Sequence, residues 1–153
     1  MMRLVLDTNI WLDWLVFEDP GVALLQTMVA AGDAGIVINA DCESELIRVL
    51  GYPLQKWTLD TAAQAACLAQ CRRIARRIET PCITALPVCA DADDQKFIEL
   101  AAAADARYLL SKDQALLEME RRNPPLPFHI MTPDEFAAHR SVELAGKVLS
   151  RKI

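Results

Sequence analysis

The sequence is poor in glycine and lacks any long hydrophobic run. Five glycines in 153 residues leave no glycine-rich loop that would hold a pyrophosphate, which disfavours a dinucleotide-binding dehydrogenase. No window approaches the roughly 18 uninterrupted apolar residues of a membrane helix, so we expect no membrane span. The chain reaches Asp7 with no long apolar stretch behind a basic start, and we therefore expect no secretory signal.

Paired cysteine motifs are also missing. The cysteines are odd in number and irregularly spaced, which argues against a disulfide framework; the five are Cys42, Cys67, Cys71, Cys82 and Cys89. A reduced, cytoplasmic protein fits this pattern better. Cys67 and Cys71 would share a helix face, but no CxxC pair or nearby histidine supports a metal site. We expect these two to pack in the core.

Positive charge does not exceed negative charge. The chain has 16 Lys and Arg residues against 21 Asp and Glu residues, a formal net charge of −5. A nucleic-acid-binding protein usually presents a basic surface. A metal site built from acids, beside a local basic patch, would also leave the net charge negative. Net charge therefore does not decide whether the protein binds nucleic acid.

Short apolar runs alternate with segments of helical periodicity. We predict strands at residues 3–6, 36–40, 107–111 and 128–131, and helices at residues 9–17, 20–31, 41–50, 60–78, 91–104, 113–120 and from 133. This alternation predicts an α/β protein, a three-layer α/β/α structure with a central, mostly parallel sheet of four to five strands. The length suits one domain, which we place at residues 1–140, followed by a helical or frayed tail at residues 141–153.

Acidic residues follow the predicted strands. Asp7 follows the first strand, Glu45 lies in the helix after the second, and Asp113 follows the third. Ligands of parallel sheets bind at the carboxyl ends of the strands, so these acids should meet at one edge. Carboxylates gathered there repel one another unless a divalent cation neutralises them. Oxygen ligands suit Mg²⁺ or Mn²⁺, ions that assist phosphodiester hydrolysis.

Each acid taken alone has a simpler explanation. Asp113 has the position of a helix N-cap, and Glu45 that of a solvated helix residue. Three acids at the start of one helix, Asp91, Asp93 and Asp94, fit the preference of a helix dipole for negative charge. Only the joint placement of the acids favours a metal site.

Three segments of the chain resemble the PIN-domain family. They are LVLDTNIWLDWL at residues 4–15, ESELIRVL at residues 43–50 and DADDQKFIELAAAADARYLLSKDQALL at residues 91–117. They occur in the family's order, and the resemblance extends over roughly residues 4–135. It implies a PIN-like fold and a metal site whose ligands, which are also the catalytic residues, are Asp7, Glu45, Asp94 and Asp113.

Three other residues would support this site. The helix register favours Asp94 as the ligand of its block and leaves Asp91 nearby as a candidate outer ligand. Asn9 would orient Asp7 or a water molecule through its amide, unless it is simply the N-cap of the first helix. Ser111 stands where the family commonly has threonine, and its hydroxyl retains the capacity to hydrogen-bond.

The resemblance implies a Mg²⁺- or Mn²⁺-dependent endoribonuclease. Small single-domain members of the family are commonly toxins that have an antitoxin protein as partner. Two other classes stay open: a non-catalytic module of the same fold that binds RNA or protein, and a phosphoryl-accepting signalling domain. The latter would use Lys112, but it would also need two adjacent acids after the first strand, which are missing.

Basic residues gather in one segment. On the predicted helix at residues 60–78 four arginines would share one side and could bind RNA phosphates, although a solvated helix end is the simpler explanation; they are Arg72, Arg73, Arg76 and Arg77. Arg48 lies one turn beyond Glu45, where it would reach a substrate phosphate or pair with an acid.

The first two predicted helices are rich in apolar residues. Trp11 and Trp14 are three residues apart, which favours packing in the core or at a dimer face over base stacking. Exposed apolar side chains on these helices would suit self-association or an antitoxin segment; the candidates are Trp14, Leu15, Phe17, Leu24 and Leu25. We expect a homodimer, the commonest symmetric assembly.

Overall fold

Five strands form a single sheet in the computed structural model, which describes residues 1–81, 85–122 and 125–151. Cys82 and the last two residues of the predicted tail lie outside the described residues. Every neighbouring pair of strands is parallel, in the order β3-β2-β1-β4-β5. The strands are β1 (Met2–Leu6), β2 (Ala34–Ile38), β3 (Ala75–Arg77), β4 (Tyr108–Leu110) and β5 (His129–Met131). The predicted parallel sheet of four to five strands is confirmed.

Helices connect the strands. They are α1 (Thr8–Leu15), α2 (Ala23–Ala30), α3 (Ala40–Leu50), α4 (Thr61–Ile74), α5 (Gln95–Ala103), α6 (Gln114–Leu117) and α7 (Pro133–Arg151). Short 3₁₀ turns lie beside them: η1 (Pro20–Val22), η2 (Ala92–Asp94) and η3 (Glu118–Arg121). Several helices begin at a side chain that accepts a first-turn N–H, which satisfies backbone groups left free at a helix start; these N-caps are Asp7, Asn39, Asp60 and Asp113.

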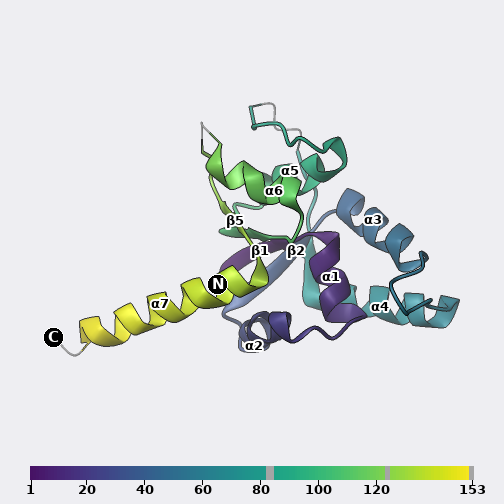
Figure 1. Ribbon diagram of the computed structural model, residues 1–153, viewed down its shortest axis with the longest axis horizontal. Helices are drawn as coiled ribbons and strands as arrows, with labels where there is room; N and C mark the ends of the chain where they lie inside the picture. Colours follow the sequence, from purple (N-terminus) through teal and green to yellow (C-terminus); the bar gives the residue numbers. More distant parts are fainter. Residues whose placement is uncertain (82–84, 123–124, 152–153) are drawn as a thin grey trace.

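The order of the strands reverses between β1 and β4. From β1 the chain moves outward through β2 to β3, and then it returns across the sheet to β4 and β5. Right-handed crossovers place the helices of these two halves on opposite faces of the sheet. Figure 1 shows α5 and α6 on one side of the strands and α1 and α2 on the other, as the three-layer prediction requires. A reversal of this kind leaves a crevice beyond the carboxyl ends of the two central strands.

The helix predicted at residues 60–78 is wrong in its last turn. α4 ends at Ile74, and the next three residues form β3, which pairs with β2. Alanine and arginine favour a helix there, but the ladder with β2 satisfies the same backbone groups and adds an edge to the sheet. As a result, the four arginines do not share one helix face: Arg72 and Arg73 lie on α4, while Arg76 and Arg77 lie on β3.

Both tryptophans of α1 belong to the core. Trp11 and Trp14 are buried, and their ring centroids are 6.0 Å apart. The prediction that Trp14 and Leu25 are exposed on α1 and α2 is therefore wrong, because both face inward and are unavailable to a partner. Tyr52 and Trp57 are among the larger apolar side chains that are exposed.

The last helix packs against the fold at its start and extends away from it. α7 projects away from the sheet and its helices, and its early part contacts α2 and η1 (Figure 1). None of the described helices combines the length and the hydrophobicity that crossing a membrane requires. The four described cysteines are free thiols, and Cys71 is fully buried in the core.

We expect a large loss of stability when a buried side chain of β4 is shortened. Leu109 is 0% exposed and lies between β1 and β5. Leu109→Ala should lower the free energy of unfolding by about 2–5 kcal/mol, because it removes buried contacts and leaves a cavity. Urea denaturation followed by tryptophan fluorescence measures the loss. Val142→Ala, on the exposed part of α7, should change stability by less than about 0.5 kcal/mol. Similar losses in both variants would contradict this core.

Candidate metal centre

Asp7 lies where β1 ends, beside the end of β4. Its backbone N–H donates to the Leu110 carbonyl of β4 at 2.9 Å. Its Oδ1 accepts from the Thr8 N–H at 2.6 Å, and its Oδ2 accepts from Ser111 Oγ at 2.6 Å. The carboxylate is buried, and two neutral donors therefore fix its orientation at the switch point of the sheet.

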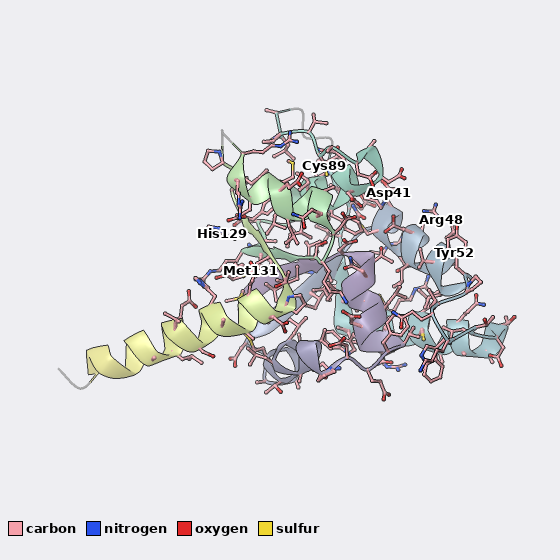
Figure 2. All side chains as sticks on the ribbon, in the orientation of Figure 1. Asp41, Arg48, Tyr52, Cys89, His129 and Met131 are labelled. Atoms are coloured by element: carbon pink, nitrogen blue, oxygen red, sulfur yellow. The ribbon has the colours of Figure 1, made fainter. Side chains whose placement is uncertain are left out.

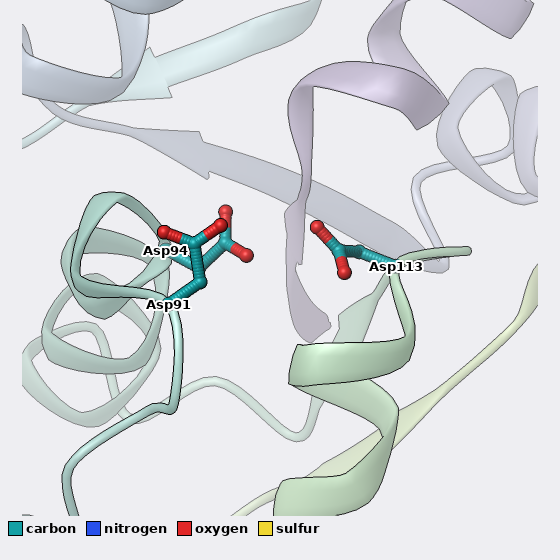
Figure 3. Close-up of side chains that lie close together, drawn as sticks. All are labelled: Asp91, Asp94 and Asp113. Atoms are coloured by element: carbon teal, nitrogen blue, oxygen red, sulfur yellow. The ribbon is translucent and has the colours of Figure 1, made fainter.

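Three other carboxyl groups converge nearby. One oxygen each of Asp91, Asp94 and Asp113 lies within 4.8 Å of the others, and Figure 3 shows the first two facing Asp113. Asp91 caps η2, and Asp113 caps α6. Asp94 is 7% exposed, and its Oδ2 has no hydrogen-bond partner among the described residues. Buried polar atoms are normally satisfied, so this oxygen is one that a cation would satisfy.

Burial shifts the pKa of two of these acids upward. It raises the pKa of Asp7 from 3.8 to about 6, and nearby negative charge adds to the rise. Burial also raises the pKa of Asp94 to about 7, together with its contact to Asp113 and the charge of Asp7. Asp7 is therefore close enough to the cluster to raise the pKa of Asp94, although the three converging oxygens belong to other residues.

Glu45 has partners of a different kind. Lys96 Nζ donates to Glu45 Oε1 at 2.8 Å, and Thr8 Oγ1 donates to Oε2. Arg48 lies one turn later, with Nη2 4.0 Å from Oε1, and Figure 2 shows it on the outside of α3. The role of Lys96 could not be predicted from the sequence, because its contact with Glu45 spans 51 residues. The one local signal is its place two residues after Asp94.

Two predicted supporting residues lie beside Asp7. Asn9 is not the N-cap of α1, because Asp7 has that role. The buried Oδ1 of Asn9 has no partner among the described residues. Ser111 Oγ donates to Asp7 and also accepts from the Asp113 N–H at 2.9 Å. One hydroxyl therefore links the end of β4 to two of the acids.

The predicted arginine patch is divided between two places. Arg72 Nη2 lies 2.7 Å from Glu43 Oε1, and Arg77 Nη1 lies 3.6 Å from the same oxygen. Glu43 is buried, so these ion pairs tie α3 to α4 and β3. Arg73 and Arg76 line a pocket of about 600 Å³ at the amino ends of β1 and β2, at the opposite edge from Asp7.

A second buried acid, Asp13, was not predicted from the sequence either. Asp13 of α1 is 5% exposed, and its Oδ2 lies 2.6 Å from Lys112 Nζ. Lys112 follows β4, so the ion pair holds the segment between β4 and α6 against α1. Like the contact of Lys96, this pair joins residues far apart in the sequence.

Fold and site together define a class of protein: a parallel α/β domain with carboxylates clustered at its switch point. The chain belongs to the PIN domain family, whose family model matches residues 3–115. Its fold is similar to that of a chain in the crystal structure of VapBC2 from Rickettsia felis bound to a DNA fragment from its promoter, with a TM-score of 0.59. The two chains have 14% sequence identity, and the match covers 84% of this chain and 97% of that chain. No curated protein matches the sequence.

The raised pKa values predict that the metal-free protein becomes less stable as pH rises. Aspartate titrates near 3.8 in the unfolded chain, but Asp7 titrates near 6 and Asp94 near 7 in the folded protein. Between these values the folded protein binds more protons than the unfolded chain, so the free energy of unfolding falls with rising pH. We expect these groups to contribute a fall of several kcal/mol, on the order of 5 kcal/mol, measured by urea denaturation with a chelator present.

Substitutions isolate this contribution from that of other groups. Asp94→Asn removes one of the two carboxyl groups with a raised pKa, so stability should depend less on pH. The exposed neighbour Asp93 provides a matched control, and Asp93→Asn should keep the slope of the parent. Equal slopes for the parent and Asp94→Asn would contradict the predicted titration.

Proposed function

We propose that this protein is an endoribonuclease that requires Mg²⁺ or Mn²⁺ and acts as the toxin of a toxin–antitoxin pair. The observation that carries the proposal is the buried carboxylate of Asp94, whose Oδ2 has no partner among the described residues and which lies beside Asp91 and Asp113. Such an arrangement is unfavourable unless a cation occupies it. Membership of the PIN domain family supports nuclease activity.

The residues present fit a divalent ion. Asp91, Asp94 and Asp113 would hold it, with Asp7 as a further carboxylate beside them. An all-oxygen set of donors suits a hard cation such as Mg²⁺ or Mn²⁺. When bound, such an ion supplies positive charge that activates water and stabilises the phosphate as its ester bond breaks.

Other residues of the chain position these carboxylates. Ser111 and the Thr8 N–H hold the two oxygens of Asp7, which prevents rotation of the carboxylate. Asp7 and Asp113 cap α1 and α6, and each accepts a backbone N–H at the start of its helix, which helps to fix the carboxylate. We assign Asn9 a role in orienting a water molecule, because its buried Oδ1 lacks a partner among the described residues.

RNA is the proposed substrate, and its phosphates need a cationic contact. Arg48, with 62% of its side chain exposed beside Glu45, is the best placed of the predicted arginines. Arg72 and Arg77 already compensate Glu43, so we expect less from them. Arg73 and Arg76 would contact only an RNA long enough to reach the other edge of the sheet.

The proposed partner is an antitoxin protein. The similar fold of VapBC2, a toxin–antitoxin complex, supports this proposal. A homodimer and a cytoplasmic location remain predictions from the sequence. A non-catalytic module that binds RNA or protein is the second candidate, and one observation favours it: Glu45, which the family resemblance implies as a ligand, is already paired with Lys96.

RNA cleavage tests the proposed function. Purified protein is incubated with single-stranded and structured RNAs in Mg²⁺ or Mn²⁺, and we expect cleavage that a chelator abolishes. Asp94→Asn should reduce the rate by more than the roughly 10- to 100-fold typical of a residue that only supports a ligand. Asp93→Asn changes the adjacent, exposed acid in the same way and should cleave like the parent.

The outcomes separate the two candidates. Cleavage that persists with chelator, or in Asp94→Asn, would overturn the metal-dependent mechanism. RNA binding without cleavage, under all metal conditions, would support the non-catalytic module.

A further inference from the structure

We propose that Lys96 takes the place of a second divalent cation in this centre. The protein then binds one ion, at Asp91, Asp94 and Asp113, and Glu45 is not a ligand. This inference rests on the metal dependence proposed above, and it narrows the set of four ligands that the family resemblance implies. What distinguishes Glu45 from the aspartates of the centre is the ammonium of Lys96, which already donates to one of its oxygens.

Lys96 is fixed by contacts within the protein. Its Nζ donates to Glu45 Oε1 at 2.8 Å and also to the backbone oxygen of Asp93. The same ammonium lies 5.2 Å from the centroid of the Phe97 ring, within the range of a cation–π interaction. The side chain is 19% exposed. Lys96 therefore keeps a positive charge at a defined position beside Glu45.

Both oxygens of Glu45 are occupied by donors. Lys96 binds Oε1, and the Thr8 hydroxyl binds Oε2, while the Glu45 side chain is 14% exposed. Asp94 differs, because its buried Oδ2 has no partner among the described residues. In the centre, the oxygen available to a cation is therefore Oδ2 of Asp94, whereas the charge of Glu45 is already balanced by Lys96.

The charge of the donors separates Glu45 from Asp7. Asp7 accepts from an amide and a hydroxyl, which are neutral and leave its negative charge available to an ion. The donor to Glu45 Oε1 is an ammonium at 2.8 Å. A divalent ion bound to Glu45 would stand beside this ammonium, and the two like charges would repel in a partly buried site where salt screens weakly.

Lys96 thereby acts as a positioning residue. Nucleases with two ions use both to offset charge on the attacking and leaving oxygens. In this centre the ammonium lies where Glu45 would otherwise hold a second ion, and it fixes Glu45 between α3 and the start of α5. The charge of the lysine is present before any metal arrives.

The test counts bound ions and does not depend on turnover. Mn²⁺ is titrated into each protein at mildly alkaline pH, where carboxyl groups are ionised, and free Mn²⁺ is followed by electron paramagnetic resonance. We expect one ion per chain in the parent and in Lys96→Arg, which keeps the charge. Lys96→Met keeps an apolar stem over Phe97 but frees Glu45, and it should bind two ions. The double variant Lys96→Met, Glu45→Gln should return to one.

The outcomes distinguish this inference from the proposed function. Two ions in the parent, or one ion in folded Lys96→Met, would overturn the role of Lys96 while leaving a metal-dependent enzyme. If Lys96→Met does not fold, Glu45→Gln decides: one ion bound as tightly as in the parent supports the proposal, and loss of the ion overturns it. A parent that binds no Mn²⁺ would reject the metal-dependent function and this inference with it.

Discussion

The centre depends on negative charge buried where the sheet changes direction. Asp7 and Asp94 are both nearly inaccessible, and the charge of Asp7 adds to the raised pKa of Asp94. The rest of the fold must compensate for this repulsion. The two central strands supply the apolar core, since the side chains of Leu4–Leu6 and Tyr108–Leu110 are buried. A bound cation would turn the same repulsion into stabilisation, because it would bind the folded chain alone.

Carboxylates of this site also serve as helix N-caps. Asp7, Asp91 and Asp113 each accept a backbone N–H at the start of a helical segment, so the residues that begin these segments also bring negative charge to the centre. Ser111 couples two of them, since its hydroxyl contacts the Asp7 carboxylate and the Asp113 N–H. A change in how a helix begins would therefore also change the centre.

The central sheet and the acids at its edge could be predicted, because strands buried on both faces are short apolar runs and Asp7 and Asp113 follow them closely. β3 could not, because two of its three residues are arginines and only pairing with β2 makes the segment a strand. The contacts of Lys96 with Glu45 and of Lys112 with Asp13 were equally inaccessible. These contacts depend on how closely the helices and strands pack, and the hydrophobic periodicity of a sequence does not give that distance.

The acids of the centre come from widely separated parts of the chain. Asp7 leaves the ribosome well before Asp113, which follows only after β4 has been made. Until then each finished carboxylate lacks its neighbours, is solvated, and titrates as an ordinary aspartate. A nascent or truncated chain thus has single carboxylates in place of the cluster. Any activity that needs all of these carboxylates is therefore confined to folded molecules in which they have come together.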